Sequence, residues 1–111
     1  MIIIGDRNTV VVGDIADEIA RLEGLLGALR RLAAGEMPSA DELAAAPLID
    51  RWLECTRPAP CLAGEVHGHP DCRGPVSVTS DVVVFAPTAG WARTISRLYR
   101  LGRHHGEEAR Q

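Results

Sequence analysis

Four arginines and two aromatic residues alternate close to the end of this 111-residue chain. They are Trp91, Arg93, Arg97, Tyr99, Arg100 and Arg103. No acidic residue lies between Gly90 and Gly106. Arginine binds phosphate or carboxylate through a planar fork, and a neighbouring aromatic ring can stack on a base or anchor a protein contact. The stretch predicts an arginine-rich partner-binding surface, with Arg100 and Arg103 facing outward.

Thiols and imidazoles form a second candidate group, within eighteen residues. Its members are Cys55, Cys61, His67, His69 and Cys72. Zinc binds such side chains, but structural zinc sites usually contain a Cys-x-x-Cys pair, which this chain lacks. We therefore predict no cofactor and no metal site. A zinc-stabilised module is the alternative, and elemental analysis would decide between them.

Catalytic patterns are missing from the sequence. Ser77, Ser80 and Cys72 are nucleophilic residues, but none has a base and an orienting group at a recognisable spacing. No Gly-rich phosphate loop follows a predicted strand. We therefore predict that the protein is not an enzyme.

Charge is distributed unevenly along the chain. All twelve basic residues are arginine, and the net charge is −3. Residues 1–54 carry ten acids and five arginines, whereas residues 55–111 carry five acids and seven arginines. An acidic chain is not a generic nucleic-acid binder, so a protein partner is favoured over a nucleic acid. Alternatively, the surface is structural, and Arg93 and Arg97 pair with acids of the first half. Those acids are Asp17, Glu18, Glu42 and Asp50.

Several features of the sequence bear on the cellular compartment of the protein. It shows neither a signal-peptide pattern nor an apolar run of membrane-spanning length. Its three cysteines, an odd number, favour free thiols in a reducing compartment. We expect a cytoplasmic protein without membrane contact.

Two apolar β-branched runs, 2–4 and 9–13, flank the turn sequence 5–8 and predict a β-hairpin. Asp14 is a suitable N-cap for a helix of about 19 residues ending at Gly35. The predicted helix carries an apolar stripe at steps of four and three residues. The stripe comprises Ile15, Ile19, Leu22, Leu26, Leu29 and Ala33, with Leu25 and Leu32 beside it. Core packing is the simpler role for the stripe, and a homodimer through the hairpin and helix is the alternative.

A second, shorter helix is predicted to begin at Ser39, which forms a capping box with Glu42. Pro47 interrupts this helix. The apolar residues Leu48, Ile49, Trp52 and Leu53 predict that a further helical turn continues to about Glu54.

Beyond Pro58 the pattern changes to short strands. Strands are predicted around 61–67, 76–80 and 82–85, with a loop at 68–75 and a turn at 86–90. Residues 91–103 fit either a helix or a strand. The tail, 104–111, is expected to be flexible.

Several motifs in residues 55–103 resemble an uncharacterised alphaproteobacterial domain-of-unknown-function family. The matching pieces are Cys61 to Val66, Gly68-His69-Pro70, Thr79-Ser80, and Gly90-Trp91-Ala92-Arg93-Thr94-x-Ser96-Arg97-x-Tyr99-Arg100-Leu101-Gly102. Such endings resemble the closing strands of small β-meanders in phage and mobile-element proteins, which favours strands over 91–103. The resemblance leaves the hairpin and long helix outside it and implies no activity.

These observations predict one α+β domain over residues 1–103. Its hairpin and helices occupy 1–54, and they pack on a small antiparallel β-meander within 55–103. The predicted function is a small interaction or regulatory protein of a phage or mobile element. It would bind a protein or nucleoprotein, for example as an inhibitor of a host defence complex. The alternative is a nucleic-acid-binding regulator that uses residues 91–103.

Overall fold

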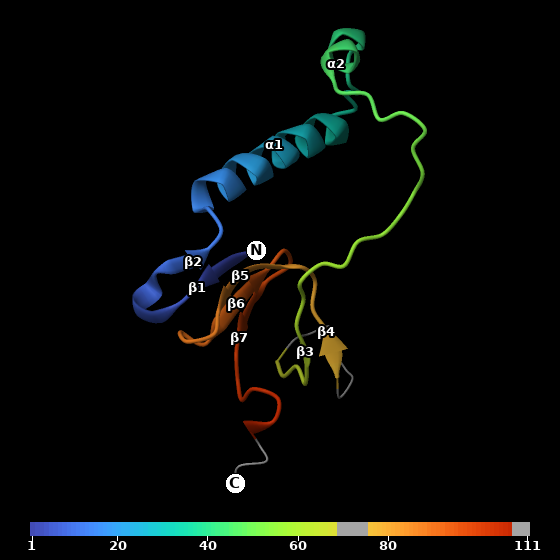
Figure 1. Cartoon of the computed structure of the whole chain (residues 1–111). Helices are drawn as coiled ribbons and strands as arrows, with labels where there is room; N and C mark the ends of the chain where they lie inside the picture. Colours follow the sequence, from blue (N-terminus) through green and yellow to red (C-terminus); the bar gives the residue numbers. More distant parts are fainter. Residues whose placement is uncertain (69–75, 108–111) are drawn as a thin grey trace. The chain divides into compact units, whose positions relative to one another are not determined.

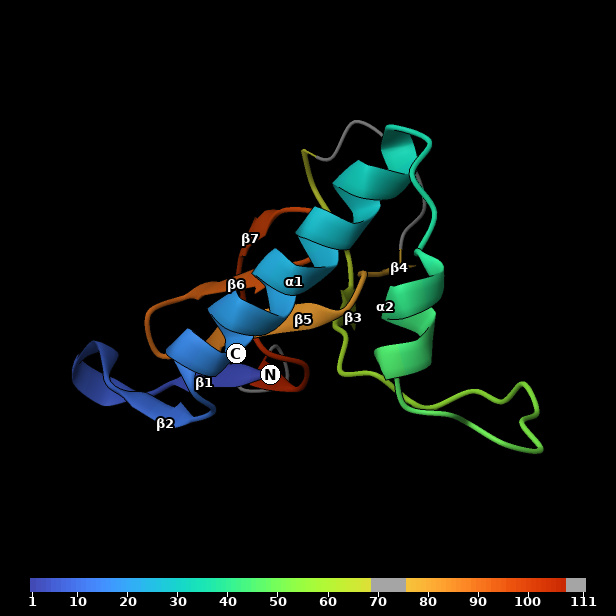
Figure 2. The same ribbon diagram turned by 90° about the horizontal axis from the view of Figure 1, so that it is seen from above.

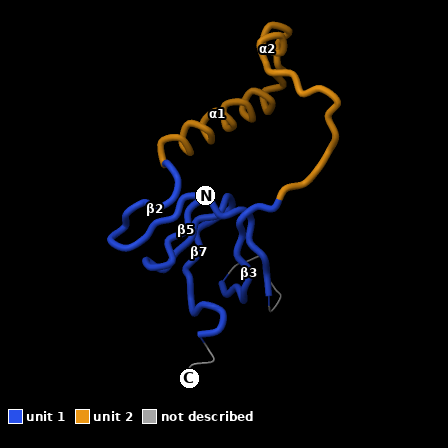
Figure 3. The backbone as a smooth tube through the Cα atoms, in the orientation of Figure 1, with its two compact units in different colours: residues 1–14, 58–111 blue, residues 15–57 orange. Residues whose placement is uncertain are grey.

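The computed structural model describes residues 1–68 and 76–107 and has an α+β architecture, as the sequence predicts (Figure 1). The chain divides into two compact units (Figure 3). One unit comprises residues 1–14 and 58–111 and contains the strands, and the other comprises residues 15–57 and contains both α-helices. We call them the sheet unit and the helical unit. His69 and Cys72, two candidates for the zinc alternative, and the tail residues 108–111 lie outside the described residues.

A five-stranded sheet in the order β2-β1-β5-β6-β7 forms the centre of the sheet unit. Its strands are β1 (Ile2–Ile4), β2 (Val10–Val12), β5 (Val82–Ala86), β6 (Trp91–Thr94) and β7 (Leu98–Arg100). The predicted hairpin and meander are both present, and residues 91–94 and 98–100 form two strands joined by a turn, where the resemblance favoured strands over 91–103. The sequence did not predict that β1 pairs in parallel with β5 and joins the two parts into one sheet.

An inner strand has hydrogen-bonded neighbours on both sides, whereas an edge strand has one side open. β1 is an inner strand and is buried or half-buried, whereas β2, at the edge, is exposed along its length. The hairpin turn between them contains a short 3₁₀ segment, Asp6–Asn8, in which Arg7 and Asn8 adopt positive φ angles of 58° and 57°. The N–H of Gly5 donates to the carbonyl of Thr9 across this turn at 2.8 Å.

The buried core of the described residues is small and lies in the sheet. Its apolar members are Ile2, Val82, Ala86 and Ala92, and its polar member is Thr94. Ala92 is 0% exposed and Thr94 is 1% exposed. The alternation of buried and exposed residues along β6 follows from the two-residue period of a strand.

A second sheet pairs β3 (Ala63–Gly64) with β4 (Ser77–Val78). Backbone hydrogen bonds connect the chain just before β3 with the segment that leads from β4 into β5. The N–H of Val82 donates to the carbonyl of Pro60, and the N–H of Thr79 donates to that of Leu62, each at 2.8 Å. The strands predicted in this region are therefore present but shorter than predicted.

The helical unit begins with α1 (Ile15–Ala33), which has the predicted length and remains one helix across Gly24 and Gly27 (Figure 2). Gly35, whose φ is 82°, follows the end of this helix. The N–H groups of Gly35 and Glu36 donate to the carbonyls of Leu32 and Arg31, both at 2.9 Å. This pair of bonds is a Schellman motif, which satisfies carbonyls at the helix end.

The second helix, α2 (Ala40–Ala45), has the predicted capping box. The Glu42 N–H donates to Ser39 Oγ at 3.1 Å, and the Ser39 N–H donates to the Glu42 carboxylate at 3.2 Å. The predicted continuation of this helix to Glu54 is wrong, because residues 47–54 contain no helix.

The physical reason begins at Ala46, which precedes Pro47 and is extended, with ψ at 147°. Proline disfavours the helical conformation of the residue before it, and one isolated turn is too short to be stable in water. Arg51 interrupts the segment again with a φ of 49°. Its apolar side chains are exposed, with Leu48 at 87% and Trp52 at 70%. The helical spacing of these residues therefore did not produce a helix.

None of the helices in the described part of the chain combines the length and the apolarity needed to span a membrane.

A candidate partner-binding face of the sheet

Three of the six predicted binding residues share one face of the sheet. Strand register aligns Ala86 with Trp91 and Trp91 with Arg100. In the next row, Val84 aligns with Arg93 and Arg93 with Leu98. Aligned residues on neighbouring strands project from the same face. Trp91, Arg93, Leu98 and Arg100 therefore form one contiguous group, which we call the arginine face.

The arginine face carries only positive charge. Arg93 and Arg100 are the only charged residues in the strands of the five-stranded sheet, which contain no Asp or Glu. Both arginines are exposed and have no ion pair with a described residue. Trp91 is half-buried, and Leu98 is 59% exposed. The face thus presents two arginine forks beside apolar surface.

The other three predicted residues lie elsewhere in the sheet unit. Tyr99 aligns with Ala92 and so lies on the opposite face from Trp91. Arg97 is half-buried in the turn between β6 and β7, and Arg103 is exposed beyond β7. The six residues are neighbours in the sequence and were predicted to form one surface. In the structure they lie on opposite faces of the strands, in a turn and beyond the last strand. Arg100 and Arg103 are both exposed, as predicted.

Thr94 was not predicted to matter, yet its hydroxyl organises the β6–β7 turn. It accepts from the N–H groups of Ser96 and Arg97 at 3.2 and 3.1 Å and donates to the Arg97 carbonyl at 3.2 Å. A buried hydroxyl with these partners replaces the water contacts that the turn would otherwise need. Because this turn sets the pairing of β6 with β7, Thr94 positions Trp91 against Arg100.

Ser80 extends this hydroxyl network to the start of β5. Its Oγ donates to Ser96 Oγ at 2.9 Å. Thr79 Oγ1 accepts from the Leu62 N–H at 3.0 Å and donates to the Ser80 carbonyl at 2.8 Å. The Thr-Ser and Thr-x-Ser pieces of the sequence motif therefore have a structural role. In the sequence, this role was indicated only by the recurrence of Ser and Thr next to the ends of the predicted strands.

Gly90 sets the other end of the arginine face. Its φ is 85°, which side chains rarely allow, and its N–H donates to the Ala86 carbonyl at 2.9 Å. Its carbonyl accepts from the Leu101 N–H at 2.9 Å. The turn before β6 and the chain after β7 are thus joined at Gly90.

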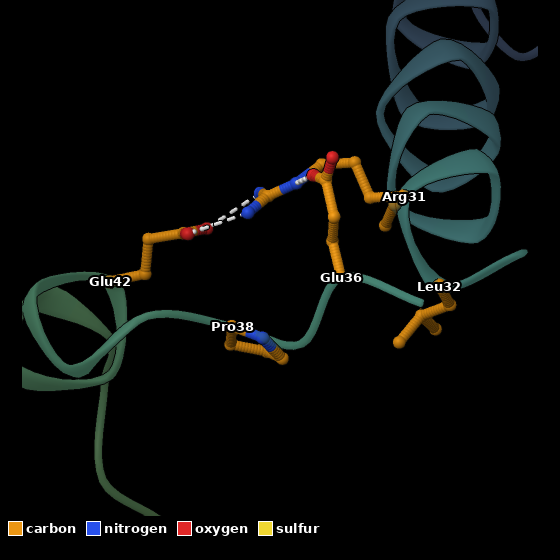
Figure 4. A pocket seen from close by; sticks show the side chains of 6 residues that line it. Arg31, Leu32, Glu36, Pro38 and Glu42 are labelled. Atoms are coloured by element: carbon orange, nitrogen blue, oxygen red, sulfur yellow. Dashed lines mark hydrogen bonds and ion pairs between the residues drawn. The ribbon is translucent and has the colours of Figure 1, made fainter. Parts of the chain in front are cut away.

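Two acids proposed as partners for these arginines already have partners in the helical unit. Glu18 pairs with Arg21, three residues further along α1. Glu42 binds Arg31 through two hydrogen bonds, at 2.8 and 2.7 Å, and Glu36 contacts the same guanidinium at 3.4 Å (Figure 4). These local pairs compete with any pairing to Arg93 or Arg97.

The Arg31–Glu42 contact has a clear electrostatic signature. The Arg31 guanidinium, followed by the Ser39 backbone N–H, lowers the pKa of Glu42 from 4.5 to about 2. The same contact raises the pKa of Arg31. An open hollow of about 140 Å³ adjoins this ion pair, and Leu32 and Pro38 are among the residues that line it. Because Arg31 lies in the last turn of α1 and Glu42 lies in α2, the ion pair joins the two helices.

Of the residues considered for the zinc alternative, Cys55 and Cys61 are free and exposed, and His67 is also exposed. Across residues 1–68 and 76–107, no three metal-binding side chains come together.

A family model for a family of unknown function, DUF6634, matches residues 19–109. The match includes most of α1, which the sequence resemblance had left outside. No curated protein and no solved structure matches the chain.

Proposed function

The chain belongs to the DUF6634 family, whose function is unknown, and we propose that it is a small non-enzymatic interaction protein that binds a protein partner through the arginine face. The observation that carries this proposal is the register that groups Trp91, Arg93 and Arg100 on one face. The strands that form this face contain no Asp or Glu.

Chemistry indicates the kind of partner. Two exposed arginine forks favour carboxylates or phosphates, and Trp91 and Leu98 add apolar contact area. Tryptophan and arginine are common anchors of protein interfaces. The chain as a whole carries −3, which disfavours general binding to a nucleic-acid backbone. An acidic protein surface with an apolar centre is therefore the favoured partner.

The proposal also includes a setting. The odd number of cysteines favours the reducing cytoplasm, and the resemblance of the motifs in residues 55–103 favours a cell that carries a phage or mobile element. Inhibition of a host defence complex is one regulatory role compatible with a small binding protein. A nucleoprotein partner would meet the same arginine face through its protein or its phosphates.

A comparison of two charge-reversed variants in a pull-down from the native host tests the binding face. Arg93→Glu/Arg100→Glu should remove the specific partner, because both forks become repulsive to carboxylates. Arg51→Glu/Arg57→Glu has the same change in net charge, involves exposed arginines outside the sheet, and should retain the partner. If both variants retain the same partners, the arginine face is not the binding site.

Oligonucleotide binding tests the nucleic-acid alternative. Labelled single-stranded and duplex DNA and RNA would be titrated with the protein at about 50 and 200 mM salt, across which phosphate contacts weaken strongly. We expect no measurable binding at the lower salt concentration. Tight binding that weakens steeply with salt and is lost in Arg93→Glu/Arg100→Glu would replace the protein partner with a nucleic acid.

A further inference from the structure

Strand β7 forms one edge of the five-stranded sheet, and two of its residues belong to the arginine face. Its three residues are aligned with three consecutive residues of β6, so this edge is regular. Among the described strands, β7 contacts only β6 extensively. The sheet itself therefore leaves the other side of this backbone open, and an open strand edge is a template for another strand.

Two hydrogen bonds show which way the backbone of β7 faces. The carbonyl of Arg97, just before the strand, accepts from the Thr94 N–H at 2.9 Å. The N–H of Leu101, just after the strand, donates to the Gly90 carbonyl, also at 2.9 Å. Arg97 and Leu101 therefore direct these groups toward β6 and the turn before it.

The residues between Arg97 and Leu101 follow from the same pattern. In an antiparallel pair, the backbone groups of successive residues face the neighbouring strand and the open side in turn. Tyr99 therefore faces β6, whereas Leu98 and Arg100 face the open side. No described residue is hydrogen-bonded to the N–H groups or carbonyls of these two residues. Two N–H groups and two carbonyls thus point away from the sheet.

An extended backbone satisfies these four groups as a set. The groups alternate along β7 at the spacing of a strand, which the alternate residues of a second strand match. Strand addition of this kind is a recurring mode of protein recognition. Main-chain hydrogen bonds supply the affinity, and the alternate side chains of the added strand supply the specificity.

Side chains at the edge indicate the chemistry of the added strand. Leu98 and Arg100 project from the arginine face, so alternate residues of an added strand would lie beside them on that face. Together with its flanks, β7 carries Arg97, Arg100 and Arg103 and contains no acid. An acid opposite Arg100 forms a favourable cross-strand pair, and an apolar residue opposite Leu98 extends the apolar surface. In an antiparallel strand, the acid precedes the apolar residue by two positions.

A second copy of β7 does not have this chemistry. Two β7 strands side by side would place three arginines against three arginines, and like charges in opposed positions destabilise a sheet.

The other edge of the sheet, β2, differs in register and charge. Its pairing with β1 is irregular between Ile3 and Ile4, and the strand consists of three valines. A bulge makes an edge a poor template for a further strand. In addition, β2 carries no charge that would select an acidic segment. The observations therefore favour β7.

We propose that β7 binds an extended acidic segment of the partner protein, which adds to the sheet as a strand antiparallel to β7. This inference rests on the proposed binding at the arginine face and specifies its form. The main chain of the partner pairs with Leu98 and Arg100, an acid lies opposite Arg100, and an apolar residue two positions later lies opposite Leu98.

Amide hydrogen exchange during a peptide titration tests strand addition. The probe is the acetylated and amidated peptide Thr-Glu-Thr-Glu-Thr-Val-Thr. In the free protein, the N–H of Tyr99 should exchange more slowly than those of Leu98 and Arg100. At peptide concentrations about ten times the Kd, exchange at Leu98 and Arg100 should slow about tenfold, whereas exchange at Tyr99 should change little. Unchanged exchange at Leu98 and Arg100 up to millimolar peptide would overturn the proposal.

Methylation of the peptide backbone separates main-chain pairing from side-chain contact. N-methyl groups on the second Glu and on the Val replace N–H groups that would face β7, and should weaken binding by about tenfold or more. The control peptide carries N-methyl groups on the two inner Thr residues, whose N–H groups would face away, and should bind with less than about a threefold change. Equal effects of the two peptides would refute strand addition.

Two substitutions at one position test the edge from the side of the protein. Leu98→Pro removes an outward N–H, and proline is accepted in edge strands where the N–H is open. Leu98→Ala also shortens the side chain but retains the N–H. Leu98→Pro should therefore bind the peptide about fivefold more weakly than Leu98→Ala. Trp91 fluorescence would confirm that both variants fold, and equal affinities would contradict the proposal.

The native partner distinguishes this inference from the proposed function. Together with the peptide results, loss of the partner from both Leu98→Pro and Arg93→Glu/Arg100→Glu would support strand addition. If Leu98→Pro retains the partner and Arg93→Glu/Arg100→Glu loses it, the arginine face is the binding site and only the added strand is refuted. If both variants retain the partner, the proposed function fails as well.

Discussion

The sheet unit and the helical unit are stabilised in different ways. The sheet unit joins residues far apart in sequence, such as Ile2 with Val84, and buries a small core that includes Ala92 and Thr94. The helical unit relies on local contacts, namely a Schellman end, a capping box and short-range ion pairs, and buries no side chain. Local contacts specify helices, but burial of apolar area supplies most of the stability of a fold.

This difference suggests a division of roles. The sheet unit has the elements of a rigid platform, which is the type of scaffold that positions a binding face. The helical unit displays its apolar residues, which suits a surface that becomes ordered by association. Three changes would test this comparison, from the largest expected effect to the smallest.

Ala92→Asp should have the largest effect. Ala92 is fully buried between Phe85 and Tyr99 in register, so the variant would place an unpaired carboxylate in the core. Burial of such a group costs several kcal/mol, and we expect a loss of about 3 kcal/mol or more in the free energy of unfolding. Denaturant titration followed by Trp91 fluorescence in a Trp52→Phe background would measure it.

Arg93→Asp, at the exposed neighbouring position on β6, is the control for Ala92→Asp and should change stability by less than about 1 kcal/mol. Helical circular dichroism from α1 should survive in both variants. Equal losses in the two variants would show that the sheet has no distinct core at Ala92.

Thr94→Val should have an intermediate effect. The variant keeps the shape of the side chain but leaves the N–H groups of Ser96 and Arg97 without their acceptor. Loss of buried hydrogen bonds of this kind costs about 1–3 kcal/mol. Thr94→Ser retains the hydroxyl and should lose less, by the same denaturant titration. If serine and valine are equally destabilising, methyl packing rather than the hydroxyl stabilises the turn.

Acid should produce the smallest effect, confined to the helical unit. Because the folded-state pKa of Glu42 is below its ordinary value of 4.5, its contact with Arg31 is complete above pH 4.5 and is lost as the pH falls toward 2. NMR of the side-chain carboxyl carbon should show a midpoint at about 2. Arg31→Gln should move the midpoint back toward 4.5, whereas Arg30→Gln should leave it near 2. An ordinary midpoint in the wild type would mean that the ion pair does not persist in solution.

Prediction from sequence succeeded where the signal was local. The bounds of α1 followed from the Asp14 and Gly35 signals and the apolar stripe, and the Ser39–Glu42 capping box followed from four consecutive residues. It failed at 47–54, where the apolar residues have helical spacing but form no helix. Spacing specifies which side chains would share a face, but a short turn after a proline lacks the packing needed to form.

The candidate site shows the same limit. Its arginines and Trp91 were visible in the sequence as a cluster, and their charge follows from residue type alone. Which of them act together depends on the pairing of β5, β6 and β7, in which neighbouring residues project from opposite faces. For that reason Tyr99 lies on the opposite face, whereas Leu98, which was not among the predicted residues, lies on the arginine face.

By itself, the sequence determined the elements with local signals: the hairpin, the long helix with its stripe, the capping box and the positive charge near the C-terminal end. Tertiary structure alone decided that β1 joins β5 in parallel, that Trp91, Arg93 and Arg100 share a face, and that Thr94 supports the turn between their strands. The physical reason is that turns, caps and helix periodicity depend on residues a few positions apart. Strand register depends on hydrogen bonds between separate segments, which lie most of the chain apart for β1 and β5 and on either side of one turn for β6 and β7.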